Sequence, residues 1–236
     1  MTKYNLHIVY YINCLINSNY LDWLKHQLKY MTTQVNDKNI IELNKSKIYI
    51  IASIKKTQEK NFINKLNEFY PESIFEIEFF PDNEYEYQGI KKVWNLGQIY
   101  NNKNDIILYY HSKGMSRNTE YKYNKNDKYN IILKDIKKIF KIYNEFSEID
   151  KIGYSCGGNG WIWYNFWYAR GSYINSLENP IKTNRRHYYE SWLGRKIKFD
   201  KERSNLKNCY SFHTNENVPN IGFYYNPNSN KYCKIE

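Results

Sequence analysis

The sequence predicts an α/β fold in which a mainly parallel central sheet is flanked by helices. Over residues 1–115, apolar runs of strand length alternate with segments of helical period, in the order β-α-β-α-β-α-β. This alternation is typical of parallel strands joined by right-handed crossovers. The run at residues 106–110 is apolar throughout, as expected of a strand that is covered on both faces.

The strands of this first half are rich in β-branched, aliphatic and aromatic residues, and we expect them at residues 5–11, 47–52, 74–80 and 106–110. Residues 74–80 alternate apolar residues with Glu, which indicates a strand near an edge of the sheet. The first helix begins after Ser18 or Asn19, and the next two cover residues 57–70 and 88–100. Apolar residues at helical spacing form their buried faces: Leu21, Leu24, Leu28 and Met31; Phe62, Leu66 and Phe69; Ile90, Val93, Leu96 and Ile99.

The second half, residues 116–236, has a different composition. A polar loop at residues 116–128 precedes an amphipathic helix at 130–146, a short strand at 152–155 and a short helix at 172–177. Residues 157–170 combine three Gly with three Trp, and a polar tail follows residue 194. No internal repeat and no long linker divides the chain, so we expect a single domain over residues 1–236.

Composition limits the classes of partner. The chain is crowded with Asn, Lys and Ile, whose codons are AT-rich, as in a large DNA virus, a protist or an AT-rich bacterium. The net charge of +11 would suit a nucleic-acid-binding module that uses Lys for phosphates and Tyr for stacking. Because the Lys residues are spread through every helix, a solvated surface is the better interpretation, and no nucleic-acid partner is expected.

The cysteines and the N-terminus bear on compartment. Cys14, Cys156, Cys209 and Cys233 are far apart and form no C-x-x-C pair, so neither a zinc site, a redox motif nor a disulfide framework is expected. The N-terminus lacks the apolar core of a signal peptide, and no apolar run is long enough to span a membrane. We therefore expect a soluble cytoplasmic protein, in the host cytoplasm if the source is viral.

The strongest candidate site follows the central strand. His111, Ser112 and Lys113 stand where the strand at residues 106–110 leaves the sheet, and Gly114 gives the backbone freedom for a turn. Ligands of open α/β sheets bind outside the carboxyl ends of strands, and these side chains suit an anionic, oxygen-rich ligand. On pattern alone, an ordinary polar loop is the simpler alternative. No Gly-rich fingerprint follows any strand, which disfavours a Rossmann dehydrogenase and a P-loop NTPase.

Three short segments, residues 107–114, 165–170 and 188–194, together resemble a family of GT-A-type glycosyltransferases related to rhamnan-synthesis enzymes. Residues 107–114 (ILYYHSKG) resemble the family's LYLHTKG segment. Residues 165–170 (NFWYAR) resemble its GNFWWAR segment, and residues 188–194 (YYESWLG) resemble its RYxxExWLG segment. The match spans roughly residues 85–195; the first 85 residues fit by topology only, and the tail is unmatched.

The resemblance implies a GT-A-like nucleotide-binding half and an aromatic-rich acceptor-side half. It implies a nucleotide-sugar donor across the carboxyl ends of the strands and a glycan or glycoprotein acceptor. Metal-dependent members carry Asp-x-Asp where this chain has His111, Ser112 and Lys113, so a Mn²⁺ or Mg²⁺ cofactor is disfavoured. We expect Lys113, with His111, to stabilise the departing nucleoside diphosphate instead.

Glu190 is the expected catalytic base, because an inverting transfer needs a carboxylate near the acceptor hydroxyl. A structural ion pair with Arg185 or Arg186 is an equal alternative. Asn165, Trp167 and Arg170 are the expected substrate-binding residues. Any single Trp is nevertheless more often part of a core than a sugar-stacking platform, and this applies to Trp161, Trp163, Trp167 and Trp192 alike.

The donor's nucleoside is expected at the ends of the first strands. The residues assigned to this donor site are Tyr11, Asn13, Ser53, Tyr87, Lys91, Ser112 and Gly114. Ordinary loop polarity is the alternative for each of them. The acidic residues Asp82, Glu84 and Glu86 precede a helix and are interpreted as structural, favoured by the helix N-terminus. No metal ligand is assigned, and His213 in the tail is a weak candidate. Because Asp-x-Asp is missing, a catalytically inactive, sugar-binding relative is a further alternative.

Overall fold

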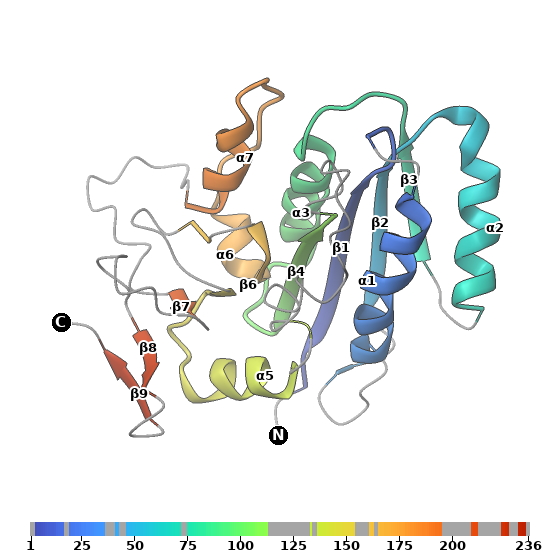
Figure 1. Cartoon of the computed structure of the whole chain (residues 1–236). Coiled ribbons are helices and arrows are strands. Elements are labelled where there is room, and N and C mark those ends of the chain that lie inside the picture. Colours follow the sequence, from blue (N-terminus) through green and yellow to red (C-terminus); the bar gives the residue numbers. More distant parts are fainter. Residues whose placement is uncertain are drawn as a thin grey trace.

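The structure is a computed structural model of the whole chain, shown in Figure 1. It describes residues 3–16, 19–35, 41–42, 46–71, 75–112, 133, 136–153, 161–162, 165–194, 209–211, 223–226 and 231–234. All structural statements below concern these residues.

The described strands form one mixed sheet in the order β3-β2-β1-β4-β6-β5-β7-β8-β9. Their bounds are β1 Asn5–Asn13, β2 Lys47–Ser53, β3 Phe75–Phe80, β4 Asp105–His111, β5 Lys151–Gly153, β6 Trp167–Arg170, β7 Cys209–Ser211, β8 Phe223–Asn226 and β9 Lys231–Lys234. β1, β2, β3 and β4 run parallel to one another, whereas β6 lies antiparallel between β4 and β5. The sheet is thus mostly parallel, and it continues through both halves of the chain.

Helices cover both faces of this sheet (Figure 1). Their bounds are α1 Tyr20–Val35, α2 Glu59–Phe69, α3 Tyr87–Ile99, α5 Ile136–Glu145, α6 Gly171–Asn175 and α7 Arg186–Ser191, with short 3₁₀ helices at Lys56–Gln58 (η2) and Trp192–Gly194 (η5). The buried side chains of α1, α2 and α5 pack on one face, and those of α3, α6 and α7 pack on the other. The α/β class with helices on both faces is therefore confirmed.

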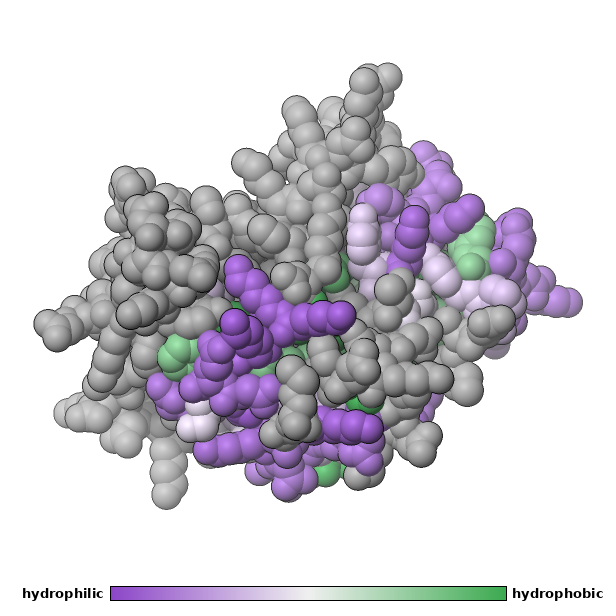
Figure 2. All heavy atoms as spheres, turned by 90° about the horizontal axis from the view of Figure 1, so that it is seen from below, coloured by the Kyte–Doolittle hydropathy of each residue, from purple (hydrophilic) through white to green (hydrophobic). Residues whose placement is uncertain are grey.

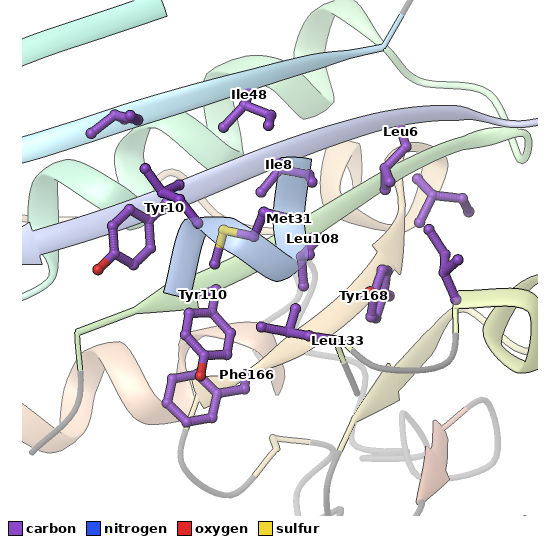
Figure 3. Packing of buried hydrophobic residues seen from close by; sticks show 14 of the residues in the cluster. Leu6, Ile8, Tyr10, Met31, Ile48, Leu108, Tyr110, Leu133, Phe166 and Tyr168 are labelled. Carbon is purple, nitrogen blue, oxygen red and sulfur yellow. The ribbon is translucent and has the colours of Figure 1, made fainter. Parts of the chain in front are cut away.

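The core on the α1 side is built around β1 and β4 (Figure 3). Alternate residues of these strands point into it, because successive side chains of a strand face opposite sides of the sheet. Tyr110 stacks on Phe166 with 4.3 Å between ring centroids, and Met31 of α1 fills the space beside Leu108. This stacking anchors the segment before β6 against the C-terminal end of β4.

On the face opposite α1, Gly89 brings the start of α3 close to the sheet. A Cβ atom on Gly89 would lie 2.8 Å from the Cβ of Tyr11 and 2.9 Å from the hydroxyl of Tyr109. No larger residue fits at this distance, so Gly89 lets the first turn of α3 approach the carboxyl ends of β1 and β4. The residues that precede α3 therefore lie at the same edge of the sheet as the end of β4.

The first-half strands and helices are confirmed to within a few residues, and β3 lies at an edge of the sheet as predicted. In the second half, α5 falls within the predicted helix, and β5 and α6 overlap the predicted strand and helix but each begins one residue earlier. The loop at 116–128 lies outside the described residues. Several described elements were not predicted: the antiparallel strand β6, the helix α7, and the strands β7, β8 and β9 in the polar tail. The sheet therefore contains more antiparallel pairs of strands than the sequence indicated.

The cysteines require a correction. Cys14 is a free, buried thiol, and burial raises its pKa well above the ordinary value. Cys209, in contrast, is disulfide-bonded, which the wide spacing of the cysteines did not predict. The sequence spacing of cysteines is a poor guide here because the distance that matters is the one in the fold.

The described residues on the face seen from below are largely polar. Figure 2 views the edge that is at the bottom of Figure 1, and its described residues are mostly hydrophilic, with hydrophobic ones in small separate spots. This agrees with Lys side chains that form a solvated surface. Within the described ranges, the helices are all too short or too polar to traverse a bilayer.

Candidate functional site

The carboxyl ends of β1 and β4 lie next to each other at a topological switch point. From β1 the chain continues to β2 and β3 on one side, and then returns to β4 on the other side. In open α/β sheets, a crevice for ligands opens where the connections diverge in this way. The backbone amide of Ser112 donates to the carbonyl of Tyr11 (3.0 Å), and the backbone amide of Asn13 donates to the hydroxyl of Ser112 (3.2 Å). Two of the predicted site residues, Asn13 and Ser112, are thus in contact.

His111, the last residue of β4, lies in an aromatic setting. It is 8% exposed, and its ring centroid lies 4.8 Å from that of Phe166 and 6.1 Å from that of Tyr109. These contacts restrict the imidazole to a narrow range of orientations. Lys113 and Gly114, which were assigned to the same site, lie outside the described residues.

Glu86 is the residue that organises this edge. It stands at the N-cap position of α3, and its side chain makes no capping hydrogen bond to the described helix. Its Oε2 atom accepts hydrogen bonds from the amide of Asn165 (2.5 Å) and the hydroxyl of Tyr109 (3.2 Å). Its Oε1 atom lies 3.8 Å from Nδ1 of His111. Burial, together with the negative charge of Glu86, raises the pKa of Tyr109 well above its ordinary value, so that its hydroxyl remains a donor.

Asn165 joins Glu86 to the C-terminal half. Its backbone has φ 58°, a left-handed conformation that Asn tolerates better than most residues. Its side chain is buried: Oδ1 accepts from the indole of Trp167 (2.7 Å), and Nδ2 lies 3.5 Å from the carbonyl of Tyr189 as well as contacting Glu86. The prediction that Asn165 contacts a sugar directly is therefore replaced by a role in holding other groups in place.

These contacts connect the three segments in which the sequence resembles a known family. His111 belongs to the first, Asn165 to the second and Tyr189 to the third, and Glu86 lies between the first two. The sequence analysis missed Glu86 as part of the site, because its position before a helix indicated only a capping role. The signal that could have found it is its place immediately before a helix that leads into the central strand.

A cavity of about 1000 Å³ lies beside α7. Glu190, the predicted base, lines it, and its carboxylate lies 3.1 Å from Nδ1 of the exposed His187. The predicted alternative of an ion pair with Arg186 concerns a side chain outside the described part of the structure. The remaining lining residues combine aromatic, hydroxyl and cationic groups: Trp161, Ile181, Thr183, Arg185, Tyr188 and Ser191.

Two tyrosine hydroxyls fix the wall of this cavity. Tyr188 accepts a hydrogen bond from the amide of Ile181 (3.0 Å), and Tyr189 donates to the carbonyl of Thr183 while accepting from its amide (2.9 Å each). These three bonds tie the segment before α7 to the helix itself. The cavity is therefore part of a locally ordered structure.

Tyr11 and Ser53, which were expected to contact the nucleoside, are buried and contact each other. Their hydroxyl oxygens lie 3.1 Å apart, and the two residues are 3% and 0% exposed. Asn13 is nearer to the edge, where its side-chain amide donates to Asn83 (2.7 Å). Of these three, Asn13 is the one whose position suits a ligand contact.

Tyr87 and Lys91 lie on α3 near the segment that leads to α7. The ring centroid of Tyr87 lies 6.4 Å from that of Tyr189. Nζ of Lys91 donates to the side chain of Asn179 (2.7 Å) and lies over the ring of Trp94. Both residues therefore help to connect α3 with the C-terminal half.

The assignment of Arg170 to the site requires a correction, because this residue lies beside the start of β4, at the opposite end of the strand from His111. It pairs with Ile106 at the beginning of β4, whereas His111 ends that strand. Its guanidinium is buried and donates to three backbone carbonyls, those of Ile149 (2.7 Å), Lys103 (2.6 Å) and Tyr143 (3.0 Å). Arg170 is a structural residue and not part of the candidate site.

Of the tryptophans considered as sugar-binding candidates, those that the structure describes lie mainly in the core, as expected for this residue type. Trp167 and Trp192 are fully buried, so Trp167 is part of the core and does not form an exposed sugar-binding platform. Trp161 lines the cavity beside α7. Trp163 and the weak candidate His213 lie outside the described residues.

Among the residues that the structure describes, no group of three or more His, Cys, Asp or Glu side chains is arranged to hold a metal ion. Comparisons of the chain with protein-family models, curated proteins and solved structures give no match. The functional interpretation therefore depends on the residues of the site.

Proposed function

We propose that the chain is a GT-A-type glycosyltransferase that transfers a sugar from a nucleotide-sugar donor to a glycan or glycoprotein acceptor. One observation carries the proposal. The three segments that resemble this family are joined by the contacts of Glu86 and Asn165, at the carboxyl edge where α/β sheets bind ligands.

The donor's diphosphate would lie at the carboxyl ends of β1 and β4. Asn13 and Ser112 supply an amide and a hydroxyl there, His111 supplies an imidazole, and Lys113 follows directly in the sequence. As the bond from the anomeric carbon to the diphosphate oxygen breaks, its electron pair passes to the leaving diphosphate. Cationic and hydrogen-bonding groups at this position stabilise the negative charge that develops.

The acceptor would bind in the cavity beside α7. Its aromatic and hydroxyl groups suit the apolar faces and the hydroxyls of a sugar. Glu190 would take the proton of the attacking hydroxyl while the new bond to the anomeric carbon forms. His187, close to that carboxylate, is exposed and can release a proton to solvent.

A thermal-shift panel of UDP-, GDP- and dTDP-sugars tests the proposal, with Mn²⁺ in one series and EDTA in another. We expect one nucleotide class to raise the melting temperature of the wild-type protein, since a ligand that binds the folded state stabilises it. Lys113→Ala should abolish this rise, whereas Lys141→Ala, at an exposed position on α5, should retain it.

Other outcomes would point elsewhere. If no nucleotide sugar stabilises the protein and DNA or RNA binds with steep salt dependence, the chain is a nucleic-acid-binding module. A donor that binds without being hydrolysed or transferred indicates a sugar-binding protein that has lost catalysis. Activity that EDTA abolishes and Mn²⁺ restores would contradict the metal-independent role of Lys113 and His111.

A further inference from the structure

We infer that the cavity beside α7 takes an anionic sugar, one that bears a carboxylate, phosphate or sulfate group, and that Arg185 is the residue that selects it. The inference deepens the proposed function, on which it rests for the assignment of this cavity to the acceptor. The preference for a charged sugar can be measured by binding alone. It follows from the charged groups of the cavity wall and from the partners that these groups have.

The guanidinium of Arg185 is the cation that the cavity wall leaves available to a ligand. Arg185 stands at the N-cap position of α7 and is exposed. Its backbone is held firmly, because its amide donates to the hydroxyl of Thr183 (3.2 Å) and its carbonyl accepts from the amide of Tyr188 (2.9 Å). Over the described ranges of the chain, no carboxylate or carbonyl group pairs with the guanidinium. A fixed backbone therefore carries a cation that makes no polar contact within this part of the fold.

The neighbouring cationic side chains differ in this respect. Lys182 is ion-paired with Glu84. His187 lines the cavity, but its Nδ1 lies 3.1 Å from the carboxylate of Glu190. Among the lining residues that the structure describes, Arg185 is thus the one with a permanent positive charge, since a guanidinium stays protonated at any physiological pH.

The negative charge of the cavity lies towards the other end of α7. Glu190 follows Arg185 by five residues, which corresponds to about 7.5 Å along the axis of a helix that rises 1.5 Å per residue. An anionic group bound to Arg185 is kept apart from this carboxylate, whereas the reverse orientation would bring two negative charges together. The two charges therefore orient an acidic sugar, with its far hydroxyl groups towards Glu190, the proposed base.

The rest of the wall fits the body of such a ligand. Trp161 and Tyr188 offer aromatic surface to the apolar face of a sugar, and Thr183 and Ser191 add hydroxyl groups. The planar fork of a guanidinium can donate to two oxygens of a carboxylate, phosphate or sulfate at once, and hydrogen bonds to a charged group are stronger than those to a neutral hydroxyl. The net charge of +11 attracts anions to the whole surface, so the test must separate this general effect from a contact with Arg185.

The test is an NMR titration of the full chain, in which the indole N–H signal of Trp161 reports binding in the cavity and is identified by its loss in Trp161→Phe. The anionic probes are methyl glucuronide, glucose 6-phosphate and glucose 6-sulfate, and the neutral probe is methyl glucoside. We expect an anionic probe to bind about 10-fold more tightly than the neutral one, near the lower end of what hydrogen bonds to a charged group contribute, because Arg185 is open to solvent. The probe that binds most tightly identifies the anionic group.

Variants decide whether Arg185 is the cause. Arg185→Gln should abolish the preference, and Arg185→Lys, which keeps the charge but loses the fork, should retain part of it. Lys141→Gln removes one exposed charge on α5 and is the matched control, which should keep the whole preference. Equal dissociation constants for all probes in the wild-type protein, a preference that survives Arg185→Gln, or no shift of the Trp161 signal with any probe would overturn the inference.

Failure of the proposed function would look different. A protein that prefers anionic sugars through Arg185 but neither binds nor consumes a nucleotide sugar is not a glycosyltransferase, and the cavity is then the binding site of a sugar-binding protein. A protein that consumes a nucleotide sugar but shows no such preference is a glycosyltransferase without the selectivity inferred here.

Discussion

The side-chain amide of Asn165 donates a hydrogen bond to the carboxylate of Glu86, across 79 residues of sequence. Glu86 precedes α3 and Asn165 precedes β6, so this bond fastens a helix on one face to the only described strand that lies antiparallel between parallel neighbours. Because Glu86 also approaches His111, the bond determines where the end of β4 meets the C-terminal half.

Two substitutions of Asn165 separate the contribution of its backbone conformation to the stability from the contribution of its side-chain amide. Asn165→Gly keeps a residue that accepts φ 58° and loses only the amide, which should cost about 1.5–3 kcal/mol as a buried hydrogen bond to a charged group. Asn165→Ala loses the amide and also strains the backbone, which should add roughly 1 kcal/mol. Urea denaturation of both variants measures the difference, and equal stabilities would contradict it.

Gly171, at the start of α6, tolerates no side chain. A Cβ atom there would lie 1.7 Å from the carbonyl oxygen of Tyr100, a backbone atom that cannot rotate away. Gly171→Ala should therefore destabilise the protein by about 3 kcal/mol, at the upper end of the cost of overpacking. Asn175→Ala, an exposed position on the same helix, should change the stability by less than about 0.5 kcal/mol. A melting temperature of Gly171→Ala equal to that of wild type would show that α6 can move.

His7 should make the stability dependent on pH. It is buried in β1 and stacked on Tyr100 at 3.8 Å, and among the described residues neither ring nitrogen has a hydrogen-bond partner. Burial lowers its pKa from 6.5 to about 4. The unfolded chain therefore binds a proton on His7 at a higher pH than the folded protein does, and stability is lost as the pH falls from about 6.5 towards 4.

The size of this effect can be measured with a variant. The gap between the pKa values of His7 in the unfolded and folded states corresponds to a loss of roughly 3 kcal/mol in the free energy of unfolding. His7→Phe, which preserves the stacking, should flatten the decline in the free energy of unfolding between pH 6.5 and 4. His187→Phe, at a largely exposed position, should leave the decline as it is. The account of His7 is wrong if both variants follow the wild-type curve.

Arg170 should affect stability and not catalysis. Lys in its place cannot reach the carbonyls of Ile149, Lys103 and Tyr143 together, because an ammonium lacks the planar fork of a guanidinium. Arg170→Lys should cost about 2–4 kcal/mol in urea denaturation, the loss of buried charge-assisted hydrogen bonds. Lys55→Met, at an exposed position, serves as the control. An Arg170→Lys protein with wild-type stability but lost activity would restore the substrate-binding interpretation.

The sequence was most informative where local pattern and burial coincide. β1, β2 and β4 are apolar runs buried on both faces, and their order along the chain predicted a parallel arrangement. β6 was missed because its four residues lie in an aromatic segment without clear periodicity, and its antiparallel pairing with β4 depends on contacts distant in sequence.

The candidate site was predictable only in part, and for a similar reason. His111 and Ser112 were found because they end a recognisable strand, and strand ends are where ligands bind in this class. Glu86 and Arg170 were both misjudged from local sequence. A carboxylate before a helix looks like a cap, and an arginine after aromatic residues looks like a ligand-binding group. Only their partners in the fold distinguish the two roles.

Release of nucleoside diphosphate from the stabilising nucleotide sugar tests the central claim most directly, with wild type, His111→Gln and His26→Gln compared. His26 lies on α1, on the other face of the sheet, and is the matched control. We predict that His111→Gln loses about 10²-fold in kcat, as expected when a group that stabilises developing charge is removed. Its melting temperature should stay near that of wild type, and His26→Gln should retain full turnover. Equal turnover in all three proteins, or no consumption of any nucleotide sugar, would contradict the claim that the end of β4 binds the donor's diphosphate.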